Sequence, residues 1–275
     1  MQKFLYPIIY VIIFTIMQVL ATVAFLIAEL IKNPNLLEPF YASGGKESEL
    51  LRAIDPNAFS WSIIISGIMT VAIIALLQKK EKTNAMNLHV ADWRTGLMAM
   101  AGAVLCIFSM NIASEFANLP DNMEELHIDF ATSPIGLLSM ALIGPIIEEY
   151  VFRESILGHM LRKNVSAWTA IIISALIFGI IHANPAQIPA ATGIGVVLGI
   201  IYYKTGNITI PCIIHIANNS IAAWGLYEMG PESKNYSLVE AIGGHNIACI
   251  YMIISLVCGI GLLYYFWKHY PQTRP

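Results

Sequence analysis

Long runs of apolar residues, separated by short polar connections, make up most of the chain. A typical run matches the roughly 20-residue α-helix that crosses a hydrocarbon layer about 30 Å thick. The pattern predicts eight membrane-spanning helices, at residues 5–31, 60–78, 95–117, 133–161, 166–182, 188–203, 208–227 and 246–267. The expected fold class is all-α, a polytopic transmembrane helical bundle in which residues 1–275 form a single membrane domain.

The composition agrees with a membrane protein. Of the 275 residues, 57% are hydrophobic and only 12% are charged, whereas a soluble domain has about 25% charged residues. The net charge is −3 and the sequence contains no basic tract, so we expect no nucleic-acid partner. The expected partners are the lipid bilayer, which we take to be a prokaryotic plasma membrane because the protein is compact, and a peptide or membrane-protein substrate.

The distribution of charge predicts the orientation of the bundle. Most basic residues fall in one alternate set of connections and tails, namely Lys3, Lys79, Lys80, Lys82, Arg94, Arg162, Lys163, Lys204, Lys268 and Arg274. The opposite set has four basic residues and most of the acidic ones. Because basic loops stay on the cytoplasmic side, we expect both termini to be cytoplasmic.

Several polar side chains interrupt the predicted spans. An ionised side chain near the bilayer centre costs roughly 2.5–3.5 kcal/mol or more, so such residues are usually functional or paired. Three spans contain them, and the residues of interest are Glu148, Glu149, Arg153, His182, His215 and Asn219.

Their depths in the membrane can be compared at a rise of about 1.5 Å per residue. Glu148 lies about 21 Å from the basic residue Arg162 along its helix, and His182 about 24 Å from the beginning of its span. Asn219 lies about 18 Å into its own span. These polar groups fall within one slab of the membrane, so they can converge on one site.

Helical geometry separates the two adjacent glutamates. Glu149 and Arg153 are four residues apart and project on one face, which predicts an ion pair. Glu148 points about 100° away and lacks this partner. A desolvated carboxylate that faces imidazoles has the environment of a general base. His215 and Asn219 are also four apart and share one face.

Other polar and small residues have structural explanations. Glu154 and His159 lie nearer the cytoplasmic end, where we expect them to be solvated. Gly195 and Gly199 are spaced for close helix packing. The remaining histidines lie in loops, tails or span ends and carry no functional signal: His89, His127, His245 and His269.

Three short motifs lie on separate predicted spans. They are EEYVFR at 148–153, FGIIH at 178–182 and HIANN at 215–219. In type and order they match the EExxxR, FxxxH and HxxxN motifs, and the chain therefore resembles the CAAX-protease and bacteriocin-processing family of intramembrane proteins. The resemblance covers 130–227, the expected catalytic core. Residues 1–117 carry no motif, and residues 228–275 form an external loop and the last span.

The resemblance implies an intramembrane endopeptidase of the CAAX type. By analogy with the family, Glu148 and His182 activate water, while His215 and Asn219 stabilise the oxyanion. Glu149 and Arg153 hold the site. We expect no required cofactor. Zinc is the alternative that the residue types leave open, with Glu148, His182 and His215 as its three protein ligands, although the sequence lacks HExxH.

Other functions are compatible with the same residues. Family members are also associated with bacteriocin self-immunity and with scaffolding, in which cleavage has no part. Buried charges also occur in transporters and proton relays, but the chain has no paired halves with interrupted helices. Haem ligation by His182 and His215 would leave both glutamates unexplained.

Overall fold

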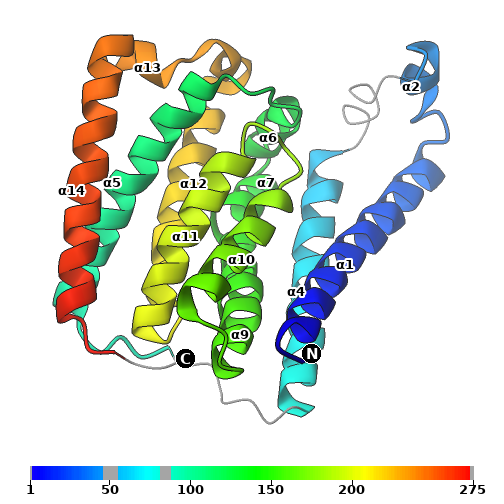
Figure 1. The fold of residues 1–275 in the computed structure, drawn as a ribbon. Helices are drawn as coiled ribbons and strands as arrows, with labels where there is room; N and C mark the ends of the chain where they lie inside the picture. Colours follow the sequence, from blue (N-terminus) through cyan, green and yellow to red (C-terminus); the bar gives the residue numbers. More distant parts are fainter. Residues whose placement is uncertain (1, 46–54, 81–87, 273–275) are drawn as a thin grey trace.

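The computed structural model describes residues 2–45, 55–80 and 88–272, and this part of the chain contains helices and no strand (Figure 1). Eight long helical segments coincide with the eight predicted spans. They are α1 (Gln2–Lys32), α4 (Pro56–Lys80), α5 (Trp93–Ala117), a composite helix from Pro134 to Arg162, α10 (Ala167–Ile180), α11 (Ile188–Thr205), α12 (Thr209–Met229) and α14 (His245–His269). The short connecting helices are α2 (Glu38–Ala42), α6 (Glu124–Ala131), η3 (Gly230–Asn235) and α13 (Leu238–Ala241). The predicted all-α bundle is confirmed.

Within the described residues, six of the helical segments are long and apolar enough to cross a membrane: α1, α4, α5, the composite helix, α11 and α14. The other two predicted spans are α10, which has only 14 residues, and α12, in which a histidine and two asparagines interrupt the apolar sequence. The HxxxN motif lies on α12, and the FxxxH motif begins on α10 and ends just after it, so the two helices that depart from ideal membrane spans are those beside the polar motifs.

The helices form a bundle with the composite helix, α10, α11 and α12 between two outer pairs, α1 with α4 and α5 with α14 (Figure 1). Small residues allow the closest approaches. A Cβ on Gly195 would lie 3.0 Å from Ala175 Cα, and one on Gly199 would lie 3.1 Å from a side-chain carbon of Ile171. The close helix packing predicted for Gly195 and Gly199 is therefore confirmed, and its partner is α10.

The composite helix, which we call the central helix, is not α-helical throughout. It consists of α7 (Pro134–Leu138), η1 (Ser139–Ile143), α8 (Gly144–Glu149), η2 (Tyr150–Leu157) and α9 (Gly158–Arg162), and both η segments are π-helical. Pro145 gives a physical reason for η1, because proline has no N–H to donate and its ring clashes with the carbonyl four residues earlier. Such π segments within α-helices are frequent at functional sites.

The two ends of the bundle differ in charge. We call the end that bears Lys3, Arg162, Lys204 and Lys268 the basic end, and the end that bears α6 and the α10–α11 connection the α6 end (Figure 1). The densest packing lies toward the basic end, where every residue of the central helix from 151 to 160 is buried.

The expectation that Glu154 and His159 are solvated is wrong. Glu154 is buried, pairs with Arg162 at 3.2 Å and accepts a hydrogen bond from the Tyr202 hydroxyl at 3.0 Å. His159 is buried against aromatic rings of α1, including that of Tyr6 at 5.2 Å. Depth along the helix is a poor guide to solvation here, because α1 and α11 cover this end of the central helix.

Candidate active site

The four predicted catalytic residues line one cavity of about 500 Å³. Glu148 comes from α8, His182 from the connection that follows α10, and His215 and Asn219 from α12. The convergence expected from their depths is therefore present. Glu149 and Arg153 lie behind this surface, in the protein interior.

Glu149 is the centre of a buried polar cluster. Its Oε1 lies 2.9 Å from Arg153 Nη1 and 2.8 Å from His215 Nδ1, and its side chain is 0% exposed. The ion pair predicted within the helix is present. The second contact crosses from α8 to α12, which spacing within one helix cannot reveal. Removing a carboxylate from water costs several kcal/mol, and both partners offset this cost.

Glu148 has the opposite environment. Its side chain is 26% exposed and faces the cavity, and its Oε2 lies 3.6 Å from His215 Nε2. The imidazole of His215 therefore lies between the two carboxylates. Because the Glu149 carboxylate can only accept, His215 Nδ1 must carry a proton, and Nε2 can donate only when the ring is an imidazolium.

His182 has a defined tautomer in its neutral form. Its Nδ1 lies 2.7 Å from the carbonyl oxygen of Phe178, which can only accept a hydrogen bond. Nδ1 is therefore protonated, and Nε2 is left as an acceptor in the neutral ring.

Phe178 explains the first position of the FxxxH motif. Its ring packs edge-on against His182 and His215, with centroid distances of 4.9 and 5.7 Å. The guanidinium carbon of Arg153 lies 4.4 Å from the centroid of the same ring. The phenyl ring thus separates the two imidazoles and contacts the buried cation. A contact of this kind contributes about 2 kcal/mol when it is desolvated.

Asn219 is held by the central helix. Its Nδ2 donates to the carbonyl of Met140 at 3.2 Å, and its Oδ1 accepts from Asn218 at 3.1 Å. Met140 belongs to the π-helical segment η1. One N–H of the Asn219 amide is therefore used in the protein, and the second is available to a ligand in the cavity.

The cavity also contains polar residues that the sequence did not predict, among them His127 and Gln187. His127 on α6 was assigned no functional signal, yet it lines the cavity with Gln187, whose Nε2 lies 3.5 Å from its ring nitrogens. Burial lowers the pKa of His127; the nearby Asp121 opposes this shift and His182 adds to it. His127 lies on α6, a short, polar helix, and Gln187 lies in the α10–α11 connection; both are outside the predicted spans, so hydropathy gives no signal for them.

The connection that carries His182 is fixed to the chain before α6. The buried Asn184 donates from Nδ2 to Asp121 Oδ1 at 2.8 Å and accepts from the backbone N–H of Asn122 at 3.3 Å. The N–H of Ala186 also donates to the carbonyl of Pro120 at 3.2 Å. These three hydrogen bonds join the connection beside His182 to residues 120–122, which precede α6.

The arrangement of the three residues named for zinc can be compared with what the ion requires. Zinc needs three or four ligand atoms at about 2.0–2.3 Å from one point. Across the ranges that the structure describes, no three histidine, cysteine, aspartate or glutamate residues are grouped so that they could hold one ion. Glu148, His182 and His215 line the same cavity without forming such a group.

The chain forms a polytopic helical bundle with a buried Glu–Arg–His cluster behind a polar cavity. These features are those of an intramembrane protein with a polar site between its helices. The family model for type II CAAX prenyl endopeptidase Rce1-like proteins matches residues 130–221. Membrane-embedded CAAX protease MroQ of Staphylococcus aureus (strain USA300) is 35% identical over 171 residues, which cover 57% of this chain and 69% of that protein.

A second relative is YdiL of Bacillus subtilis (strain 168), which carries the name of a membrane peptidase. It is 26% identical over 168 residues, which cover 58% of this chain and 68% of YdiL. No solved structure matches the chain. The chain belongs to the CAAX protease and bacteriocin-processing family of membrane endopeptidases.

Proposed function

We propose that this protein hydrolyses a peptide bond inside the membrane with Glu148 as the general base. One observation carries the proposal. Glu148 is the only carboxylate among the described residues that line the cavity, whereas the neighbouring Glu149 is occupied by Arg153 and His215. The two glutamates of the motif thus have different environments, and only Glu148 can meet a substrate and water together.

In the proposed reaction, the Glu148 carboxylate takes a proton from water as the water oxygen bonds to the carbonyl carbon. His182 Nε2, an acceptor in the neutral tautomer, orients the same water. The tetrahedral intermediate then loses its C–N bond, and Glu148 returns the proton to the leaving amine. The products are a carboxylic acid and an amine, and no other reactant is consumed.

The negative charge on the carbonyl oxygen needs hydrogen-bond donors. The second N–H of Asn219 is one, and Nε2 of His215 is the other when the ring is an imidazolium. The Glu149 carboxylate holds Nδ1 of that ring, and Arg153 pairs with Glu149. In proteases, removing one such donor costs about 2.7–4 kcal/mol of transition-state stabilisation.

We also propose that both termini face the cytoplasm. The support is the charge of the basic end, where Arg162, Lys163, Lys204 and Lys268 lie at helix ends on one side of the bundle (Figure 1). Basic residues near the ends of spans determine orientation by remaining cytoplasmic.

The activity can be tested without knowing the substrate. Membranes from cells that express the native chain or Glu148→Gln at matched levels are compared by terminal proteomics, with Glu240→Gln as the control. Glu240 is an exposed carboxylate on α13. We expect new peptide termini with the native chain and the control, and none with Glu148→Gln.

The same termini in the Glu148→Gln sample would show that Glu148 is not the base. If all three samples have identical termini while a cellular phenotype of the chain persists, the protein acts by self-immunity or scaffolding and the proposed hydrolysis is wrong.

A further inference from the structure

The cavity occupies only the half of the bundle at the α6 end. On the central helix, its lining residues lie between Ser139 and Glu148, although the helix continues to Arg162. On α12 they begin at His215, within the helix, and continue to Leu226 near its end at the α6 end. The lining residues of α4, α5 and α11 also lie in the half toward the α6 end.

The other half of the bundle is closed by packing. Beyond Glu149, the residues 151–160 of the central helix are all buried. Phe152, Ile156 and Leu157 belong to the main hydrophobic cluster with residues of α1, α4, α10 and α11. Closely packed interiors leave few voids as large as a water molecule. Among the described residues, the packing at the basic end therefore leaves no space through which a peptide could reach Glu148.

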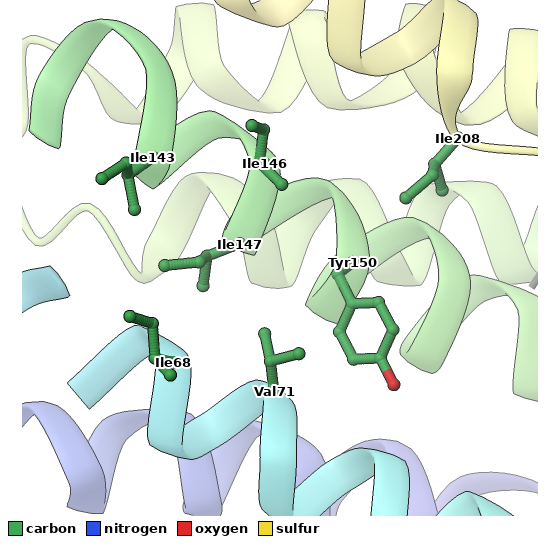
Figure 2. A pocket seen from close by; sticks show the side chains of 7 residues that line it. All are labelled: Ile68, Val71, Ile143, Ile146, Ile147, Tyr150 and Ile208. Carbon is green, nitrogen blue, oxygen red and sulfur yellow. The ribbon is translucent and has the colours of Figure 1, made fainter. Parts of the chain in front are cut away.

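A second hollow, of about 380 Å³, lies on another face of the central helix (Figure 2). It is lined by Ile68, Val71, Ile143, Ile146, Ile147, Tyr150 and Ile208, so that Tyr150 is its single polar side chain. The hydroxyl of Tyr150 already donates to Gln78 at 3.1 Å. An apolar lining of this kind suits hydrocarbon, and it gives no route for hydrolytic water.

By contrast, polar side chains line the cavity from Glu148 toward the α6 end. Asn218 lies beside the site, and His127 and Gln187 lie at the level of α6 and the α10–α11 connection. Asn111 and Ser114 add further polar groups from α5. Amide, hydroxyl and imidazole groups can hydrogen-bond both water and an extended peptide backbone.

We infer that water and the peptide reach Glu148 from the α6 end of the bundle. This inference rests on the proposed function and orientation, which together place the α6 end outside the cell. The substrate class is then an extracytoplasmic segment next to the membrane. It has no acidic residue at the cleavage site, because Glu148 would repel a carboxylate and the described lining has no lysine or arginine to bind one. The products leave on the outer side.

Cysteine labelling tests the route independently of activity. Ala190→Cys places a thiol in the cavity lining, and Lys204→Cys places one fourteen residues further along the same helix, at the basic end. Each variant is treated with a membrane-impermeant maleimide in intact cells, in inside-out vesicles and after denaturation, with the native chain as background. We expect Ala190→Cys to be labelled in intact cells, and Lys204→Cys only in inside-out vesicles.

Each other outcome decides against part of the inference. Labelling of both positions from one side, or of Ala190→Cys only after denaturation, overturns access from the α6 end. If the two thiols are labelled from opposite sides but Lys204→Cys reacts in intact cells, the route stands and the extracytoplasmic substrate is wrong. Because labelling needs no cleavage, a failure of the proposed hydrolysis is seen separately, in the Glu148→Gln comparison.

Discussion

Replacing Arg153 with methionine tests the energetics of the buried cluster. The change removes the cation whose Nη1 lies 2.9 Å from Glu149 and keeps a side chain that can fill much of the same volume. Glu149 is then a fully buried carboxylate whose remaining charged or polar partner is His215.

The expected loss follows from burial. Glu149 is 0% and Arg153 is 1% exposed, so solvent does not screen the pair. Removing one partner of such a pair costs about 3–5 kcal/mol, because the other charge stays buried and uncompensated. At about 2–4 °C per kcal/mol, the melting temperature falls by on the order of 10 °C. The loss of the contact with Phe178 acts in the same direction.

The assay is thermal unfolding of the purified protein in detergent, followed by circular dichroism, together with folded yield from membranes. The double variant Glu149→Gln/Arg153→Met completes a thermodynamic cycle. Glutamine still offers an oxygen to His215, and no buried charge is left unpaired. We expect the double variant to be more stable than Arg153→Met alone, with a coupling energy of about 1–3 kcal/mol.

A loss of less than about 1 kcal/mol for Arg153→Met would refute the reasoning, because it is below the cost of an unpaired buried charge. Strict additivity in the cycle would refute it equally, since it would mean that the two side chains do not stabilise each other.

Two further predictions concern the cavity walls. Because the pKa of His127 is lowered by burial, its contribution to stability is present above the ordinary histidine pKa of about 6.5 and is lost as the pH falls further. His127→Gln should therefore make the difference in melting temperature between pH 7.5 and pH 5.5 smaller than in the native chain, while His245→Gln, at an exposed position, should leave it unchanged. If the two variants show the same difference between the two pH values, the prediction is wrong. Gly195→Val should destabilise the protein by about 1–3 kcal/mol, because even a Cβ would lie 3.0 Å from Ala175 Cα, and unchanged thermal unfolding would show that α10 and α11 can separate at little cost.

The fold was largely predictable because the membrane imposes one rule on the whole chain. Backbone polar groups must be satisfied within each span, so hydropathy alone locates the helices. Even the departures could be located, since α12 carries its polar residues in the middle of an apolar run. Hydropathy could not find α6, a short helix with Glu124 and Glu125 in its first turn, because it lies outside the spans.

The site was predictable where chemistry and helical spacing act together. The spacing of four between Glu149 and Arg153 predicted their contact, which is present. Contacts between helices were not accessible in this way. The bond from His215 to Glu149 and the place of His127 in the cavity depend on how α12 and α6 pack, and a single sequence carries no direct record of such pairs. The catalytic roles of the cavity residues stay predictions.

The π-helical segment η2 has a consequence for how the gene can change. In this segment the hydroxyl of Ser155 donates to the carbonyl of Tyr150, five residues earlier. A π-helical turn closes its hydrogen bonds over one residue more than an α-helical turn. Deleting one residue here would therefore allow α-helical hydrogen bonding to resume while the parts of the helix on either side kept nearly the same relative orientation, and Glu148 would still face the cavity. The same deletion in the α-helical segment α9 would rotate the parts on either side by about 100°. The gene can thus lose a codon in η2 at less cost to the geometry of the central helix than in its α-helical segments.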